Sequence, residues 1–229
     1  FVPRPEVASG DLGLPGAGLQ LKLAPVGDKT EVRYKGPNVT PGYWRDPERT
    51  AEAFDEEGFL RSGDAVVWLN PLQPNLGLRF DGRIAEDFKL ATGTFVSVGP
   101  LRARIIATCA PYVHDAVITG LNQHEVGALL LATPRVRELC PLPAQASWPD
   151  VLQHPVVLAH FQDCLNQLAT QATGSANRVA RWLLLTEPPS IDLGEITDKG
   201  SINQRAVLKH REAVVQSLHD GSAPGIQRP

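Results

Sequence analysis

The apolar residues of this chain come in short runs broken by glycine and proline, and this pattern is the strongest constraint on its fold. The longest uninterrupted apolar runs cover residues 128–132 and 182–185. A membrane-spanning helix needs about 20 consecutive apolar residues. The 229 residues include 20 glycines and 20 prolines without a repeat period, which predicts many turns. We therefore expect a soluble chain of short helices and strands with no membrane contact.

Charge and cysteine content narrow the possible partners and the compartment. The 22 Lys and Arg residues against 25 Asp and Glu residues give a net charge of −3, which argues against nucleic-acid binding. Cys109, Cys140 and Cys164 are widely spaced and form no Cys-x-x-Cys pair. This spacing predicts neither a disulfide framework nor a zinc site, and it favours a reducing, cytoplasmic environment.

The first part of the chain has the two-residue periodicity of β-strands. Leu21 and Leu23 alternate with polar residues, and Val32 does the same in a second run. A short helix is expected after Asp46, because this N-cap residue is followed by proline. A further strand is predicted at residues 65–69, and the Asp-Gly pair at 81–82 predicts a turn.

After Arg83 the pattern changes to a mixture of helices and strands. We expect helices at residues 98–110, from 155 onward and at 203–219, strands at 113–119, 126–132 and 181–185, a surface loop at 134–149 and a frayed tail at 221–229. Together these patterns predict an α+β fold in two parts. A small β-rich subdomain covers residues 1–83, and an α+β domain covers residues 84–229.

Four stretches occur in an order and at a spacing that resemble a known superfamily. They are residues 36–44 (GPNVTPGYW), 58–64 (GFLRSGD), 81–89 (DGRIAEDFK) and 194–203 (GEITDKGSIN). Together they resemble the C-terminal part of adenylate-forming enzymes, which include acyl- and aryl-CoA synthetases. Two runs within the second part look most similar to the feruloyl-CoA synthase branch. On this resemblance, residues 1–83 end the AMP-binding domain and residues 84–229 form a mobile C-terminal domain.

The resemblance implies two half-reactions and a nucleotide site. ATP and a carboxylic acid give an acyl-adenylate and pyrophosphate, and CoA then displaces AMP to give a thioester. Asp64, which we expect after a turn that ends a strand, corresponds to the carboxylate that accepts both ribose hydroxyls. Arg83 corresponds to the ribose-contacting arginine, whose donors stay charged at all working pH values.

Three residues of the second part are implied in the chemistry. Lys199 corresponds to the lysine that stabilises the charge developing on the α-phosphate during adenylation. A hinge just after Arg83 is expected to let the domain swing, withdrawing Lys199 and presenting the loop near Lys89 to the thioester step. Gly93 would let the backbone approach the pantetheine channel, because glycine has no side chain.

Each residue also has a simpler interpretation when it is taken alone. Asp64 could be a turn residue, Arg83 a solvated hairpin residue, and Lys199 an ordinary surface lysine. The four stretches in order favour the functional interpretation for these three residues. The sequence departs from the superfamily at Ala85, where Asp or Lys is frequent, and in the reversed order of Lys199 and Gly200.

The chain begins at Phe1 and has no methionine, which suggests a piece of a longer protein. The phosphate loop, acid pocket and metal-binding glutamate of the superfamily precede these stretches, so we expect no Mg²⁺ ligand in this chain. The favoured function is a fragment of an acid–CoA ligase, inactive alone, that uses ATP and CoA together with a missing N-terminal domain. Two alternatives remain, a non-catalytic module derived from the superfamily and an adenylation domain that loads a carrier protein.

Overall fold

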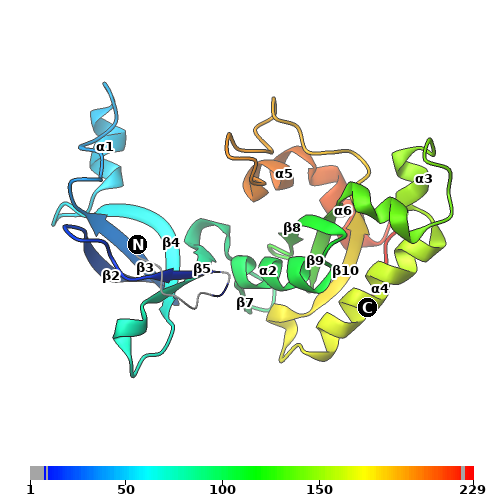
Figure 1. Ribbon diagram of the computed structural model, residues 1–229, viewed down its shortest axis with the longest axis horizontal. Coiled ribbons are helices and arrows are strands. Elements are labelled where there is room, and N and C mark those ends of the chain that lie inside the picture. The colour runs from blue at the N-terminus through cyan, green and yellow to red at the C-terminus, as the bar shows by residue number, and fades with distance from the viewer. Residues whose placement is uncertain (1–7, 9, 223–224) are drawn as a thin grey trace. The chain divides into compact units, whose positions relative to one another are not determined.

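The computed structural model describes residue 8, residues 10–222 and residues 225–229, and Figure 1 shows it as a ribbon. The chain divides into two compact units, Phe1–Ala85 and Glu86–Pro229. Each unit combines helices with strands around its own buried residues. The expected α+β fold is therefore confirmed. No helix among these described residues has both the length and the apolar surface needed to cross a bilayer.

The first unit is a five-stranded antiparallel sheet in the order β1-β5-β4-β3-β2. Its elements are β1 (Asp11–Gly13), β2 (Gln20–Val26), β3 (Lys29–Lys35), α1 (Pro47–Ala53), β4 (Leu60–Trp68), η1 (Pro74–Leu76) and β5 (Leu78–Arg83). Val32, Val66 and Leu78 form its small buried core, and Leu21 and Leu23 pack against them. The predicted alternation in β2 and β3 thus does place apolar side chains on the core face.

The predicted N-cap of the short helix is confirmed. Oδ1 of Asp46 accepts a hydrogen bond of 3.0 Å from the backbone N–H of Arg49, and Pro47 occupies the first helical position. The cap satisfies a backbone donor that has no partner within the helix.

Two predicted boundaries in the first unit are wrong. β4 begins at Leu60 rather than at residue 65, so Asp64 lies inside the strand and not after its end. The Asp-Gly pair at 81–82 lies inside β5 and makes no turn. Gly63 and Gly82 adopt positive φ angles of 71° and 94°. Glycine reaches these angles without strain, so it produces a local irregularity inside each strand where composition alone predicts an end.

The second unit is a three-stranded sheet in the order β10-β9-β8 with helices on both faces, plus a short hairpin (Figure 1). Its elements are β6 (Phe88–Lys89), β7 (Phe95–Val96), α2 (Val98–Thr108), β8 (Val113–Thr119), β9 (Val126–Ala132), η3 (Pro134–Leu139), α3 (Trp148–Leu152), α4 (Pro155–Thr170), η4 (Ser175–Asn177), β10 (Val179–Leu184), α5 (Gln204–His210) and α6 (Glu212–Asp220). The 3-10 turn η2 (Ile84–Glu86) joins the units.

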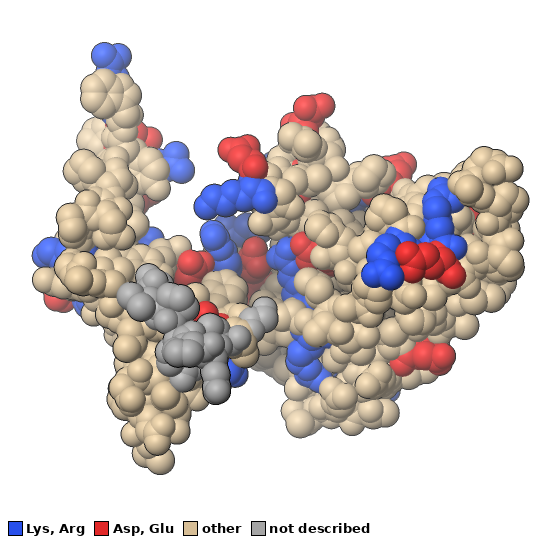
Figure 2. Space-filling model, in the orientation of Figure 1, with Lys and Arg blue, Asp and Glu red and all other residues tan. Residues whose placement is uncertain are grey.

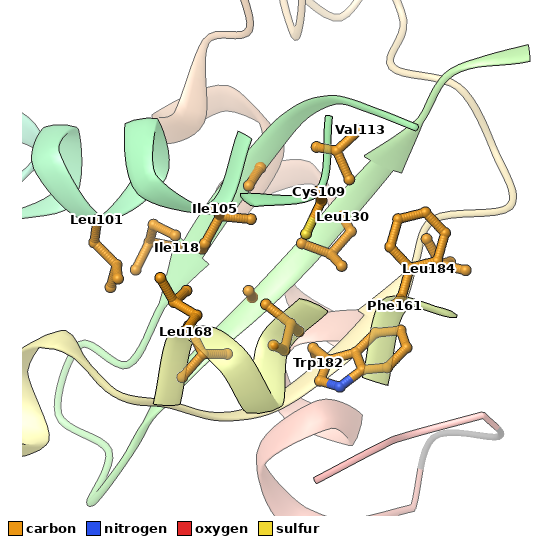
Figure 3. Packing of buried hydrophobic residues seen from close by; sticks show 14 of the residues in the cluster. Leu101, Ile105, Cys109, Val113, Ile118, Leu130, Phe161, Leu168, Trp182 and Leu184 are labelled. Atoms are coloured by element: carbon orange, nitrogen blue, oxygen red, sulfur yellow. The ribbon is translucent and has the colours of Figure 1, made fainter. Parts of the chain in front are cut away.

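Both faces of the three-stranded sheet are buried. Along β9, Ala128 and Leu130 face a core formed with α2 and α4, whereas Leu129 and Leu131 face a second core formed with α5 and α6. Figure 3 shows the first core, where Trp182 of β10 packs beside Phe161 of α4. A strand covered on both sides needs apolar residues at every position, which explains the uninterrupted run at 128–132.

Three expectations for the second unit are wrong. The helix predicted at 203–219 is two helices, because Arg211 leaves helical geometry at φ −110° and ψ 29°. An apolar stripe does not distinguish one helix from two that cover the same core. The loop predicted at 134–149 contains η3, which buries Val136. In the described part of the tail, Gln227 exchanges two backbone hydrogen bonds of 3.0 and 3.1 Å with Trp182, so this part is not frayed.

Candidate functional site

An irregularity in β4 sets the position of Asp64. Opposite β3, Glu31 pairs with Ala65 and Arg33 pairs with Arg61, so β4 has extra residues between these pairs. Gly63 occupies the left-handed region there, and its N–H donates to the side-chain Oε1 atom of Glu31 in β3 at 2.9 Å. A bulge of this kind re-aims the side chains that follow it, and here the next residue is Asp64.

Asp64 and Arg83 face each other across β4 and β5. They are registered partners in the antiparallel pair, and Nε of Arg83 lies 3.2 Å from Oδ1 of Asp64. The Asp64 side chain is 28% exposed, whereas the Arg83 side chain is 62% exposed. The sequence predicts both residues for one site, and the structure brings them together. The exposed guanidinium is free to turn toward another group, so the strength of this pair is modest.

The Asp64 carboxylate has unused acceptor capacity. Its Oδ1 atom is buried, and the contact with Arg83 lacks hydrogen-bond geometry, so this oxygen accepts no hydrogen bond from any described residue. Burial raises the pKa of Asp64 above its ordinary value, Arg83 opposes this rise and the Glu31 carboxylate adds to it. A buried oxygen without a donor is costly, and a pair of ligand hydroxyls donating to this carboxylate would remove that cost.

Lys199 lies at the tip of a short hairpin loop. Ile196 and Ile202 form an antiparallel bridge at its base, and both pack against the core under α5 and α6. The backbone of Thr197 bonds to Ser201 at 2.9 Å and to Gly200 at 2.8 Å. Lys199 itself is exposed. The base of the loop is thus fixed in the core while the ammonium group is presented to solvent, where it can meet an anionic ligand.

A buried ion pair at the base of this loop was not predicted. The carboxylate of Glu195, which is 1% exposed, accepts two hydrogen bonds of 2.9 Å from Arg211. The same guanidinium donates to the backbone oxygens of Glu187 and Pro188 at 2.9 Å. These hydrogen bonds from Arg211 hold the pKa of Glu195 below its ordinary value, against the effect of burial. The only sequence signal was the presence of Glu195 in the stretch 194–203.

Lys89 and Gly93 lie in the β6–β7 hairpin. Lys89 is exposed at the end of β6, and the N–H of Gly93 donates to Leu90 at 2.9 Å within the connecting turn. Gly93 has a φ of 83°, and a Cβ atom added there would meet no atom within 4 Å. Within this chain, therefore, the glycine is required by the positive φ of the turn and not by a close approach of another group.

The candidate residues are distributed over both units. Asp64 and Arg83 lie in the first, whereas Lys89, Gly93 and Lys199 lie in the second. Among the described residues of the second unit, no hydrogen bond or ion pair joins Lys199 to Lys89 or Gly93. No group of three or more His, Cys, Asp or Glu side chains in the described part could hold a metal ion. On the face shown in Figure 2, basic side chains lie beside acidic ones.

The fold matches one class of protein. No family model matches the chain. Among solved structures, it superimposes on the adenylation domain of a carboxylate reductase from Mycobacterium chelonae with a TM-score of 0.71 and 26% identity, covering 92% of this chain and 32% of that one. For the A domain of the carboxylic acid reductase from Segniliparus rugosus, in complex with AMP and a co-purified carboxylic acid, the TM-score is 0.70 at 23% identity, over 93% and 33% of the two chains. The chain thus has the fold of the C-terminal part of an adenylate-forming domain.

Curated relatives point to the same class. The chain is 36% identical over 200 residues to long-chain-fatty-acid–CoA ligase 5 of Rattus norvegicus, which is 85% of this chain and 28% of that protein. It is 26% identical over 219 residues to long-chain-fatty-acid–CoA ligase FadD15 of Mycobacterium tuberculosis, which is 94% of this chain and 35% of that protein. The homologues and structural neighbours are acid–CoA ligases and adenylation domains. This chain spans 28 to 35% of the length of these two ligases.

Proposed function

We propose that this chain is part of an AMP-forming acid–thiol ligase that activates a carboxylic acid as its acyl-adenylate. The observation that carries the proposal is the buried Oδ1 atom of Asp64, which lacks a hydrogen-bond donor and lies 3.2 Å from Nε of Arg83. This pair lies on a fold that the chain shares with adenylation domains.

Asp64 and Arg83 fit the ribose of a nucleotide. A ribose carries two neighbouring hydroxyl donors, and a carboxylate can accept both. Asp64 offers the acceptors, and its position inside β4, between two other strands, keeps them in place. Arg83 is exposed enough to leave its present position and donate to the same sugar while remaining charged. Bound ATP supplies the electrophilic α-phosphate, and these two residues orient it through the ribose.

Lys199 is proposed as the adenylation lysine. A cation near the α-phosphate stabilises negative charge that builds up there as the carboxylate attacks. Its loop has a fixed base and an exposed tip, which suits a group that must enter a site and leave it. We propose that residues 84–229 swing about a hinge after Arg83, so that the hairpin with Lys89 and Gly93 replaces Lys199 when the thiol of CoA attacks.

The rest of the site is proposed to lie outside this chain. Residues 1–83 would end the AMP-binding domain, and the preceding part of the polypeptide would hold the triphosphate, Mg²⁺ and the acid. We propose a cytoplasmic protein. For the acid, the resemblance of residues 84–101 and 195–208 to the feruloyl-CoA synthase branch favours an aromatic, feruloyl-like substrate. The names of the curated relatives instead offer long-chain fatty acids as the competing class.

A second candidate function is the loading of a carrier protein. It is favoured by the likeness to carboxylic acid reductases, one of which is solved as an A-PCP didomain with a TM-score of 0.68. In that case a thiol of a carrier domain would take the place of CoA. A non-catalytic module is the third possibility, and it predicts no acid-dependent turnover of ATP.

The test uses the intact polypeptide that contains this chain. It would be incubated with ATP, Mg²⁺ and either ferulate or palmitate, and AMP release and acyl-hydroxamate formation would be measured with and without CoA. Acid-dependent AMP supports the ligase, and the preferred acid decides the substrate class. Asp64→Asn should raise KM for ATP strongly, whereas Asp11→Asn, which breaks a comparable cross-strand pair with Arg79, should not. AMP release that requires no acid, or equal effects of both variants, would contradict the proposal.

A further inference from the structure

A cavity in the second unit lies at the ends of two parallel strands, and the proposed ligase chemistry does not use it. β9 and β10 run parallel, and the cavity is lined by Leu131 near the end of β9 and by Leu185 directly after β10. Its volume is about 490 Å³, which is within the range of small-molecule sites. The carboxyl ends of parallel strands are also a common place for ligands in α/β sheets. Size and position therefore both fit a binding site.

The walls of this cavity are mainly apolar. Besides Leu131 and Leu185, they include Trp148 at the start of α3 and Pro188 in the loop after β10. Arg137 of η3 brings a permanent positive charge to the same walls, and its guanidinium carbon lies 5.7 Å from the centre of the Trp148 ring. A ligand that fits such walls combines an apolar body with a negative group.

Only part of the Arg137 guanidinium is used within the chain. Its Nη1 atom donates to the backbone oxygens of Ala144 and Ala146 at 3.3 and 3.0 Å, which fixes the position of the group. Its Nε and Nη2 atoms donate to no described residue. Glu187 lines the same cavity, yet neither it nor any other described acidic side chain forms an ion pair with Arg137. The edge of the guanidinium that carries Nε and Nη2 is thus held in place without an acceptor.

Elsewhere in the second unit, the same edge of an arginine binds a carboxylate. Nε and Nη2 of Arg211 donate to the two oxygens of Glu195, while Nη1 donates to a backbone oxygen. Nε and Nη2 of Arg102 likewise donate to the two oxygens of Asp115. Two parallel N–H groups match the two oxygens of a carboxylate, which makes such pairs strong and specific. Arg137 has the backbone anchor of Arg211 and the same open edge, and a carboxylate is what completes it.

We propose that this cavity binds a small carboxylic acid with an apolar body. Its carboxylate accepts two hydrogen bonds from Nε and Nη2 of Arg137, and its apolar body lies against Trp148, Leu131 and Leu185. The charged pair fixes the orientation of the ligand, and the apolar walls supply the contact area. An uncharged analogue of the same shape keeps the walls and loses the charged pair.

The experiment uses the 229-residue chain with 1-naphthoate as the probe. Calorimetry at neutral pH compares its affinity with that of 1-naphthamide, which has the same rings without the charge. NMR of the indole N–H groups, with Trp148→Phe to identify one signal, locates the site. We expect saturable binding of naphthoate, about tenfold tighter than the amide, and a shift of the Trp148 signal. Equal affinities, no saturation at millimolar probe or an unshifted Trp148 signal would overturn the proposal.

Two variants test the role of Arg137, and neither depends on the proposed ligase activity, because probe binding needs no turnover. Arg137→Gln should remove the preference for naphthoate over naphthamide. Arg135→Gln, which breaks an exposed pair with Glu138 outside the cavity, should keep that preference. Unchanged naphthoate affinity in Arg137→Gln would refute the assignment. If Arg137→Gln fails to fold, the comparison of acid with amide in the wild-type chain and the Trp148 signal still decide.

Discussion

The Glu195 carboxylate and the Arg211 guanidinium are joined by two hydrogen bonds of 2.9 Å, side on, at the base of the Lys199 loop. The side chains are 1% and 12% exposed. Arg211 also holds the backbone at Glu187 and Pro188. One guanidinium therefore connects the start of the loop, its middle and the junction of α5 with α6.

Replacing one partner of this pair should be costly. We expect Glu195→Gln to lower the free energy of unfolding of the second unit by about 3 kcal/mol, because the Arg211 charge stays buried without its counter-charge. Urea denaturation followed by circular dichroism measures this. Glu138→Gln is the matched control, since its pair with Arg135 is 57% and 53% exposed, and it should leave the stability nearly unchanged. Similar losses in both variants would contradict a special role for the buried pair.

The buried carboxylate of Asp64 should lower the stability of the folded chain when it is ionised and no ligand is bound. Its pKa is raised by burial, so between the ordinary and the raised value the native state binds more protons than the unfolded state. Stability therefore falls as pH rises through that window. We expect Asp64→Asn to melt at the same or a higher temperature than wild type, with a difference that grows from about pH 4 to about pH 7. A variant that melts lower throughout would show that Asp64 is a structural residue.

Lys199→Ala in the intact protein should separate the two half-reactions. We expect adenylation to fall by at least about a hundredfold, the scale of a lost charge-stabilising group, while thioester formation from supplied acyl-adenylate is retained. Lys209→Ala, which removes another exposed lysine of the same unit, is the control and should affect neither step. If Lys199→Ala slows both steps equally, or neither, the proposed role is wrong.

The buried His219 should make the stability of the second unit sensitive to acid. Burial first, and the nearby Arg181 second, lower the pKa of His219 to about 4 from an ordinary 6.5, and its Nε2 atom lies 2.8 Å from Oγ1 of Thr119. Because the unfolded chain binds the proton more readily, stability is complete above pH 6.5 and is lost as pH falls toward 4, by about 1 to 3 kcal/mol. In urea titrations, His219→Gln should reduce this loss of unfolding free energy between pH 6.5 and pH 4. Replacement of the exposed His114 by Gln should leave the loss unchanged.

The 229 residues on their own should not form AMP from ATP and an acid. AMP formation would be assayed at high protein concentration. Known small amounts of the intact enzyme, added to parallel samples, would set the detection limit. The expectation follows from the proposed division of the site, in which the triphosphate and acid lie against the preceding part of the polypeptide. Acid-dependent AMP formation by this chain alone would show that the division is wrong.

The strands and helices follow from the sequence where a residue pattern is compatible with only one local structure. The alternation at Leu21 and Leu23 and the cap at Asp46 are local features, and the structure has both. It failed at Ser62-Gly63-Asp64, because the same residues favour a turn or a bulge, and the choice depends on Glu31 in another strand. The resemblance assigned Asp64 and Arg83 to one nucleotide site, but their pairing across β4 and β5 was not predicted, since register cannot be read from either segment alone.

The Glu195–Arg211 pair shows a second limit. Its members are sixteen residues apart, and a glutamate in a polar loop looks like any solvated group until the fold buries it. A pattern based on apolar periodicity gives no signal for a charge that is buried with its partner.

The sheet β10-β9-β8 has one more consequence. In most half-exposed strands, a shift of pairing by one residue drives apolar side chains into water, and this penalty fixes the alignment. Here a shift would only exchange Leu129 and Leu130 between two apolar interiors. The hydrophobic effect on the side chains of β9 alone therefore does not set the alignment. The neighbouring strands supply what is missing: the buried Asp115 of β8 pairs with Arg102, and the large indole of Trp182 in β10 fits beside Phe161, so one register satisfies both.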